Sequence, residues 1–357
     1  MTKNVISAPL IGHGNPFAAE AILRLGEAEG ISSQLVYQKA IPRLANLAHQ
    51  FRTSVPALAE RYTKDSSARE GVLAKAFGRL SFLELSHRLG DTEPGTTLHL
   101  TQEHVLLGTP QERLQGRGID HVNLLVPDVY PKSSGKAALA KYVGSTALVW
   151  NRACYDELTA EGLQAKLVKP FYLDAFSPDQ FNRVGRKVVA KISGSGMPRQ
   201  WRKQLSDAMS CLEDPDWSAH YPDMISSGQG VQAIDSLNDS IEGFFGDLGA
   251  NTRVVIGFPS ELVNVVFDMK SRGVPVVMIT LPPRGEHEYR NLQTAFQYGL
   301  AVAELRFDDR PPTIDGLGAI YCSDLAASIT NLQRDVEIDD HFLGTMPYWR
   351  SLISSHV

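Results

Sequence analysis

Apolar and polar positions follow one another along this chain in an order that predicts strands, loops and helices in regular alternation. The clearest stretch is 253–298, in which β-branched runs at 254–256 and 274–280 bracket a segment with apolar residues at helical spacing. A polar loop and a second helical segment follow. Because successive strand and helix units build parallel sheets, both helices are expected to begin at one edge of the same sheet.

The same order extends over most of the chain and predicts an α/β fold. Strands are expected at 5–9, 35–37, 98–107, 121–126, 147–150 and 165–168 in the first half, and at 187–192, 231–234, 254–256, 274–280 and 320–323 in the second. Residues 41–91 are predicted to be helical without a recognisable motif, and 213–223 to be a polar loop.

The length of 357 residues allows two domains with separate cores. Residues 1–170 are expected to form a first Rossmann-like domain and 187–338 a second one. A linker at 171–186, rich in turn formers, is expected to join them. A C-terminal helix at 339–357 is expected to pack back on the first domain.

Composition and charge exclude several classes of protein. Hydrophobic residues make up 43% and charged residues 21%, which is typical of a soluble globular enzyme. A net charge of −5 without a basic run argues against nucleic-acid binding. Three scattered cysteines favour a reducing compartment, and we expect neither a signal peptide nor a spanning helix, hence a cytoplasmic protein. Peripheral contact with a membrane, through one amphipathic face, stays open.

Two candidate catalytic residues follow predicted strands of the first half. His13 lies between Gly12 and Gly14 in the turn after residues 5–9, which places it where ligands bind in parallel sheets. Its ordinary pKa of about 6.5 suits a general base. Asp128 follows 121–126 and is expected at the same edge. The alternatives are a tight turn with a capping histidine, and an aspartate that caps the turn after it.

Two loops of the second half suggest an anion site. The first contains Ser193, Gly194, Ser195 and Gly196, and Arg199 lies in the helix that follows. Amide groups at a helix start, with an arginine, can bind a diphosphate. The loop lacks the GxxxxGK[ST] spacing of a P-loop, and an ordinary turn with solvated basic residues is the alternative.

The second loop opens the helix after 254–256. Its Ser260 and Glu261 lie at the helix start, where backbone donors and a hydroxyl can meet an anion. The neighbouring loop at 281–288 is dense in polar groups. Together these loops predict a site for a phosphate-bearing ligand with sugar hydroxyls beside it.

These features, in this order, resemble the GT-B glycosyltransferases, and within them glycosyltransferase family 28, which includes MurG and the monogalactosyldiacylglycerol synthases. The resemblance covers most of the chain in order and spacing but rests on few specific motifs. They are the glycine and histidine loop at 12–16, the strand end at 126–131, the loop at 193–196, and the Gly-Val-Pro start of a strand at 273–275.

The closest match lies within 253–298. Asp268 stands where the family has a glutamate that binds the donor ribose, and His287, Glu288 and Asn291 match a segment that binds the donor sugar. The sequence differs from the family at 259–262, where Pro-Ser-Glu-Leu replaces a glycine-rich phosphate turn.

The resemblance implies two Rossmann-like domains facing across a cleft, with the donor on the second domain and the acceptor on the first. It implies a hexosyltransferase-type enzyme that moves a sugar from a nucleotide diphosphate sugar, with a UDP-sugar favoured, to an unknown small-molecule, lipid or glycan acceptor. Inversion is expected, without metal or further cofactor. His13 would be the base, and Asp128 would orient or replace it. The donor-binding set would be Gly12, Gly14, Ser193, Gly194, Ser195, Gly196, Arg199, Ser260, Glu261, Asp268, His287, Glu288 and Asn291.

Other functions remain as alternatives. A nucleotide-sugar hydrolase or epimerase would use the same fold. A catalytically silent GT-B subunit that binds a nucleotide sugar or a partner enzyme is favoured by the loss of glycines near Pro259. A dinucleotide-dependent enzyme is disfavoured because neither glycine loop has the GxGxxG spacing.

Overall fold

The computed structural model describes residues 2–9, 14–38, 72–89, 92–128, 131–168, 170–176, 184–191, 199–210, 216–220, 241–283, 286–307 and 311–330. Contacts divide the chain into two compact units, and among these residues unit 1 ends at Ala175 and unit 2 begins at Phe176. The predicted C-terminal helix at 339–357 lies outside the described residues.

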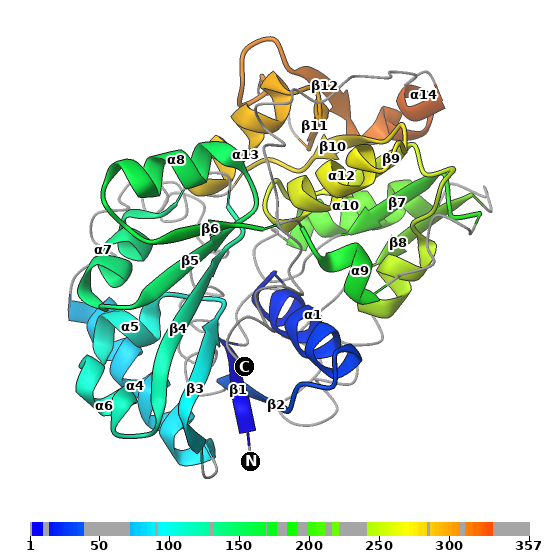
Figure 1. Cartoon of the computed structure of the whole chain (residues 1–357). Helices are drawn as coiled ribbons and strands as arrows, with labels where there is room; N and C mark the ends of the chain where they lie inside the picture. Colours follow the sequence, from blue (N-terminus) through cyan, green and yellow to red (C-terminus); the bar gives the residue numbers. More distant parts are fainter. Residues whose placement is uncertain are drawn as a thin grey trace. The chain divides into compact units, whose positions relative to one another are not determined.

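Unit 1 is built on a parallel sheet between two layers of helices (Figure 1). Its described strands are β1 (Thr2–Pro9), β2 (Ser33–Gln38), β3 (Thr92–Leu100), β4 (Ile119–Val126), β5 (Ser145–Val149) and β6 (Ala165–Leu167). Its described helices are α1 (Gly14–Ala28), α4 (Val72–Arg88), α5 (His104–Gly108), α6 (Gln111–Gln115), α7 (Ser133–Lys141), α8 (Arg152–Ala160) and α9 (Tyr172–Phe176).

The sheet of unit 1 has the strand order β2-β1-β3-β4-β5-β6. One face forms a core of strand residues such as Leu98, Leu124 and Val149 with buried residues of α4, α5, α7 and α8. The other face is covered by α1, whose Phe17 and Ile22 are buried. Strands buried on both faces are nearly continuous apolar runs, which is why β4 was predictable from its sequence.

Unit 2 repeats this architecture. Its described strands are β7 (Val188–Lys191), β8 (Trp217–His220), β9 (Val254–Gly257), β10 (Val277–Thr280), β11 (Ala301–Arg306) and β12 (Gly318–Tyr321), in the order β12-β11-β10-β9-β7-β8. Its described helices are α10 (Arg199–Ser210), residues 241–247, α12 (Glu261–Ser271), α13 (Glu286–Gln297), the 3₁₀ turn η4 (Cys322–Asp324) and α14 (Leu325–Thr330).

The two units share one strand order. Counted from its own first strand, each sheet reads 2-1-3-4-5-6, and every pairing is parallel among the described residues. The order reverses between the first and third strands of each unit, which are β1 and β3 in unit 1 and β7 and β9 in unit 2. In doubly wound sheets such a reversal opens a crevice at the carboxyl ends of the strands. The predicted α/β class with two Rossmann-like units is therefore confirmed.

Several predicted elements need correction. The strand expected at 98–107 ends at Leu100, and its apolar end, Val105 to Leu107, belongs to α5. The segment 213–223, predicted to be a loop, contains β8, and β11 was not predicted at all. The strand expected at 274–280 begins only at Val277. The strand expected at 231–234 lies outside the described residues.

Candidate functional site

The carboxyl edge of the unit 1 sheet carries Asp128, the candidate catalytic residue of the first half that the structure describes. β1 leads into residues 10–13, and α1 begins at Gly14. Gly12 and His13 lie outside the described residues, so the role of His13 stays a prediction. The neighbouring strand β3 leads into Thr101 and Glu103, and β4 into Asp128, all of which are buried.

Asp128 and Glu103 belong to one charged group, which we call the Glu103–Asp128 cluster, made of Glu103, Asp128, Lys132 and Ser134. The Lys132 ammonium lies 3.3 Å from Asp128 Oδ2. The Ser134 hydroxyl, in the first turn of α7, donates a hydrogen bond of 2.5 Å to Glu103 Oε1. Lys132 also acts electrostatically on Glu103. Among the described residues, Lys132 thus acts on carboxylates that follow two neighbouring strands.

The pKa of Glu103 is lowered from its ordinary value of 4.5. Burial on its own raises this pKa, but the nearby His104 and Lys132 and the Ser134 hydroxyl stabilise the carboxylate and outweigh burial. Glu103 is therefore an anion at neutral pH. The sequence analysis missed this residue, although a carboxylate three positions after a strand end was a usable signal.

The lowered pKa makes the stability of unit 1 dependent on pH. The stabilisation from ionised Glu103 is fully present above about pH 4.5 and is lost as the pH falls through the lower pKa of the folded state. We expect the urea midpoint of the wild type to fall between pH 4.5 and pH 3, and that of Glu103→Gln to fall less steeply. Glu27→Gln, at an exposed position of α1, should follow the wild type. Parallel curves for Glu103→Gln and the wild type would contradict this prediction.

In unit 2, one row of residues crosses the sheet at its carboxyl edge. Strand register places His220, Lys191, Gly257, Thr280 and Glu304 side by side on β8, β7, β9, β10 and β11. Their neighbours Ala190, Ile256 and Ile279 belong to the apolar core on one face, so the row lies on the opposite face. This edge of unit 2 therefore presents a line of polar groups beneath the strand ends.

Lys191 is the most unexpected member of this row because lysine is almost never fully buried. Its residue exposure is 2%, and its ammonium lies 5.9 Å from the centre of the Phe244 ring. Next to it, His220 Nε2 lies 2.9 Å from Asp247 Oδ2. The loop with Ser193, Gly194, Ser195 and Gly196 begins just after β7 and lies outside the described residues. Arg199 is the first residue of α10.

The start of α12 lies very close to the sheet. A Cβ at Gly257 would lie 2.0 Å from Leu262 Cδ1 and 2.7 Å from the Lys191 carbonyl oxygen, so only glycine fits there. Ser260 is the N-cap of α12, and its hydroxyl makes no capping hydrogen bond. Glu261 is the first helical residue. The predicted helix N-terminus is therefore present. It belongs to α12, which follows β9, and β9 pairs with β7 at the switch point of the sheet.

The residues predicted to bind the donor sugar lie on α13, the helix that follows β10. Glu288 and Asn291 are buried, and His287 is partly buried. Helix α13 contacts α12 and β11. These three residues therefore stand in the first turns of a helix that starts at the same edge as α12, as the sequence predicted.

Asp268 lies elsewhere. It is the eighth residue of α12, so it stands about 10 Å along the helix from Glu261 at 1.5 Å per residue. Its carboxylate is buried and pairs with Arg272 through two hydrogen bonds, Nε to Oδ1 at 2.9 Å and Nη2 to Oδ2 at 3.1 Å. Its predicted contact with a donor ribose would have to compete with this ion pair.

A second buried ion pair stands at the end of β11. Arg306 donates a hydrogen bond to the Glu304 carboxylate. The same carboxylate accepts a hydrogen bond of 2.8 Å from the Thr313 backbone amide and one of 3.1 Å from the Thr313 hydroxyl. Glu304 and Arg306 are both buried, and neither was singled out from the sequence.

The described residues hold no group of three or more histidine, cysteine or acidic residues placed to bind a metal ion. None of the helices among them has the length and apolar character needed to cross a membrane.

Comparison with known proteins finds similarity at the level of fold. No protein-family model matches the sequence, and no curated protein sequence matches it. MurG of Acinetobacter baumannii is similar over 92% of this chain and 90% of its own, with 12% identity and a TM-score of 0.40. The UGT73P12 protein of Glycyrrhiza uralensis, complexed with glycyrrhetinic acid 3-O-monoglucuronide, is similar over 92% and 87%, with 10% identity and a TM-score of 0.44.

A putative UDP-N-acetylglucosamine 2-epimerase of Listeria monocytogenes is similar over 95% of this chain and all of its own, with 10% identity and a TM-score of 0.39. MurG, which the sequence resemblance named, is thus among the solved structures to which this chain is similar. At such identities and TM-scores the similarity concerns the fold, and no residue takes a role from it.

Proposed function

We propose that this chain is a glycosyltransferase that moves a sugar from a nucleotide diphosphate sugar to the hydroxyl group of an acceptor. The observation that carries the proposal is the arrangement of unit 2, in which a buried Lys191, the N-terminus of α12 and the buried residues Glu288 and Asn291 all belong to the carboxyl edge of one parallel sheet. Such an edge, next to a switch point, is where open α/β sheets bind ligands. A UDP-sugar is the favoured donor.

In this proposal the second unit holds the donor. The amides of the loop with Ser193 to Gly196, together with Arg199 and the start of α12, would bind the diphosphate, and Lys191 adds a positive charge at the base of that loop. Positive charge and N–H groups stabilise the diphosphate as it leaves, without a metal ion. His287, Glu288 and Asn291 would bind the hydroxyls of the sugar.

The first unit would hold the acceptor and the base. His13 would take the proton of the acceptor hydroxyl while that oxygen attacks the anomeric carbon from the side opposite the diphosphate, which inverts the configuration. Asp128 would hold or replace the imidazole as the proton acceptor. The Lys132 ammonium lies 3.3 Å from its carboxylate.

A titration with nucleotides tests this proposal. We expect one of UDP, GDP, TDP or CDP, added without metal, to raise the unfolding temperature clearly more than the others, because a ligand at a hundredfold excess over its Kd stabilises the folded state by about 2.7 kcal/mol. Calorimetry should give the same ranking, and magnesium should not change it. A protein that responds to none of the four, with or without magnesium, has no donor site.

One observation favours a second candidate, a catalytically silent GT-B subunit. Asp268, matched by resemblance to the ribose-binding acid, is already paired through both oxygens with Arg272. A chain that kept the fold but lost the donor would tolerate such a pair. A silent subunit that has lost the donor gives no thermal shift in the nucleotide titration. A silent subunit that still binds the donor gives a shift but no turnover, so a turnover assay with the identified donor separates it from the enzyme.

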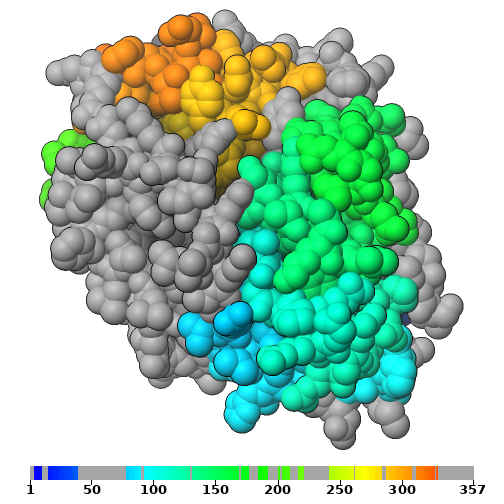
Figure 2. Space-filling view, turned by 90° about the vertical axis from the view of Figure 1, so that its left-hand side faces the viewer, coloured from blue at the N-terminus to red at the C-terminus, as the bar shows by residue number. Residues whose placement is uncertain are grey.

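Peripheral contact with a membrane is a further part of the proposal. A pocket of about 540 Å³ in unit 1 is lined by the cations Arg79, Arg113 and Lys141 and by apolar residues, including Leu83, which is 58% exposed. In Figure 2 the light blue surface of α4 lies beside the cyan and green surface of the following segments. Cations around exposed apolar side chains suit an anionic lipid surface.

Co-sedimentation with lipid vesicles tests this contact. Binding is expected with vesicles that contain phosphatidylglycerol and not with pure phosphatidylcholine, and Arg79→Ser should weaken it. Arg117→Ser, at an exposed position outside the pocket lining, is the matched control. Equal binding to both kinds of vesicle, or none, removes the membrane from the proposal.

A further inference from the structure

Unit 1 has a second cavity, of about 390 Å³, at the amino ends of β5 and β6. The polar residues of its described lining are Asn123, Thr146, Thr159, Gln164 and Lys166. Small ligands usually bind in pockets of about 300 to 1,000 Å³, so the volume suits a ligand at the small end of that range. Thr159 and Gln164 are exposed, and the cavity is therefore accessible from solvent.

Strand register brings the polar lining of this cavity together. Asn123 on β4 pairs directly with Thr146 on β5. Gln164 comes just before β6, and its backbone carbonyl accepts a hydrogen bond of 2.9 Å from the Ala147 amide of β5. Lys166 is the middle residue of β6. The four side chains Asn123, Thr146, Gln164 and Lys166 therefore come from three neighbouring strands and line one cavity.

The wall of the cavity at the end of α8 is fixed by backbone hydrogen bonds. The Leu163 amide donates to the Leu158 carbonyl at 3.0 Å, and the Gly162 amide donates to the Thr159 carbonyl at 3.0 Å. This pair of bonds is a Schellman motif, which ends a helix at a residue in the left-handed conformation. Gly162 has that conformation, with φ of 75°. The turn that leads to Gln164 is therefore an ordered part of the fold.

Four polar side chains of the lining have no partner. Among the described residues, those of Asn123, Thr146, Gln164 and Lys166 make no hydrogen bond and no ion pair. Asn123 is the most informative of them because it is only 7% exposed. A carboxamide buried to this extent normally has a hydrogen-bond partner. Its side chain borders a cavity with room for a ligand, and the same ligand would reach the Lys166 ammonium.

The chemistry of the lining indicates a class of ligand. Lys166 is the single charged residue of the described lining, and an ammonium group binds phosphate or carboxylate oxygens. The carboxamides of Asn123 and Gln164 donate and accept hydrogen bonds, as the hydroxyl groups of a ligand do. The described lining contains no aromatic ring on which a nucleobase could stack. A small ligand with several hydroxyl groups and one anionic group fits these residues.

We propose that this cavity binds a sugar that carries one oxyanion, either a phosphate or a carboxylate. The Lys166 ammonium pairs with the oxyanion, and the side chains of Asn123, Thr146 and Gln164 form hydrogen bonds with the hydroxyl groups.

The cavity is separate from the carboxyl edge of the sheet. Asn123 lies three residues before the end of β4, which is about 10 Å along a strand that rises 3.3 Å per residue. Thr146 is the second residue of β5. The proposed ligand is therefore neither the donor nor the acceptor of the proposed function, and the inference does not rest on that function.

Calorimetry in a buffer without phosphate or sulfate tests the proposal. The probes are glucose 6-phosphate, glucose 1-phosphate and glucuronate, and glucose and inorganic phosphate represent the two parts of the ligand. At least one charged sugar should bind about tenfold more tightly than either glucose or inorganic phosphate, because only the charged sugar engages both the ammonium and the amides. Preference for a sugar phosphate or for glucuronate then identifies the oxyanion.

Two variants assign the binding to this cavity. Lys166→Gln should bind the charged sugar about ten- to a hundredfold more weakly, the effect of losing a charged hydrogen bond, and should bind glucose as the wild type does. Asn123→Leu should weaken the charged sugar about fivefold. Arg117→Gln is the matched control, because Arg117 is an exposed cation just before β4 and outside the described lining. It should bind every probe as the wild type does.

The results that would overturn the inference are specific. They are the absence of binding by every charged sugar, binding of glucose or inorganic phosphate as tightly as the charged sugars, and an equal loss of affinity in Lys166→Gln and Arg117→Gln. Lys166 is only partly buried and has no partner to lose, so Lys166→Gln is expected to fold and decides the question even where Asn123→Leu does not fold. Binding at this cavity without any response to nucleotides would defeat the proposed function and leave the inference standing.

Discussion

Replacing Asp268 by alanine is expected to lower the free energy of unfolding of unit 2 by about 3 kcal/mol. Removal of Asp268 takes away the carboxylate that Arg272 contacts through two hydrogen bonds, and breaking a buried ion pair from one side costs about 3 to 5 kcal/mol. The Asp268 side chain is 1% exposed and that of Arg272 18%, so some solvation of the arginine keeps the expected value at the lower end. Urea unfolding, monitored through hydrogen exchange in α12, measures this loss of stability.

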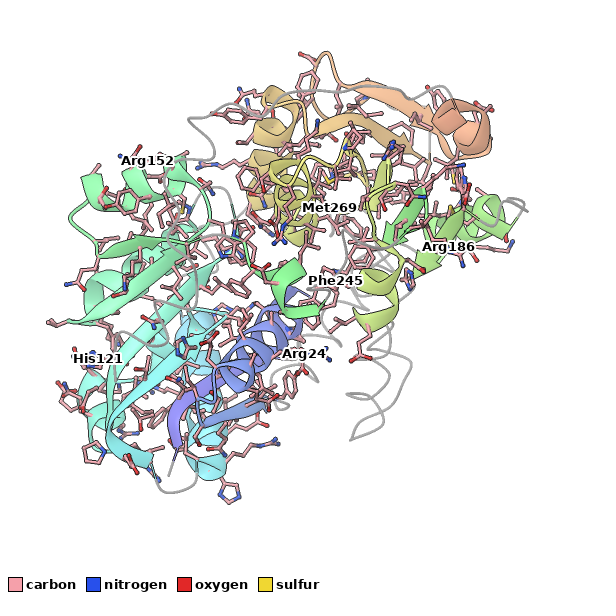
Figure 3. All side chains as sticks on the ribbon, turned by 45° about the vertical axis from the view of Figure 1, so that its right-hand side comes forward. Arg24, His121, Arg152, Arg186, Phe245 and Met269 are labelled. Atoms are coloured by element: carbon pink, nitrogen blue, oxygen red, sulfur yellow. The ribbon has the colours of Figure 1, made fainter. Side chains whose placement is uncertain are left out.

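An exposed pair of the same residue types provides the control. Arg152 and Asp156 are also four residues apart on a helix and 2.8 Å apart, but their side chains are 44% and 46% exposed. Arg152 is the first residue of α8 and is labelled in Figure 3. Asp156→Ala should cost no more than about 0.5 kcal/mol. Similar losses for the two variants would show that burial does not strengthen the Asp268–Arg272 pair.

The same variant tests the role that the resemblance gives to Asp268. If the carboxylate binds a donor ribose, Asp268→Ala should weaken the binding of the nucleotide identified by titration. Asp268→Asn, which retains a hydrogen-bond acceptor for Arg272, should lose less stability. Unchanged nucleotide affinity in a folded Asp268→Ala protein would assign the residue to the structure of α12 alone.

Replacing His13 by alanine is expected to lower the turnover number by about 10²- to 10⁴-fold, which is the usual contribution of a general base. The affinity for nucleotide should stay within a few fold, because the base acts on the acceptor. Steady-state rates with the identified donor, together with calorimetry for binding, give the two numbers. Turnover in the wild type should fall as the pH drops below the pKa of the base, and the remaining turnover of His13→Ala should lack that step.

His121→Ala is the matched control for this variant. His121 is an exposed residue near the amino end of β4 and lies on the outer side of unit 1 (Figure 3). It should retain full turnover. A His13→Ala protein that loses turnover, nucleotide affinity and thermal stability together would show that the histidine holds the turn in place and is not the base.

The strands at the centre of each sheet were predictable because parallel strands buried on both faces leave apolar runs in the sequence. Edge strand β8 left none, since its four residues, Trp217–His220, are only partly buried. β11 was not predicted for another reason. It ends in the charged residues Glu304 and Arg306, which are buried as an ion pair. The run Val105 to Leu107 was wrongly predicted to continue a strand, because a short apolar run is compatible with a strand and with a buried helix alike.

The candidate site was predictable where a residue follows a strand directly. Asp128 and Ser260 were placed by that rule and lie at the expected edges. Lys191 was missed because it is the last residue of an apolar strand and its burial depends on packing around Phe244. Asp268 came from the resemblance alone. Its seven-residue distance from Glu261 already implied a place about 10 Å from the helix start.

The shared strand order also makes two turns of the chain equivalent. In each unit the turn after the first strand, β1 or β7, stands at the reversal of a sheet that runs 2-1-3-4-5-6. Under the proposed function, one of these equivalent turns would carry the base and the other would bind the diphosphate. One position of the fold would then serve two different steps of the reaction.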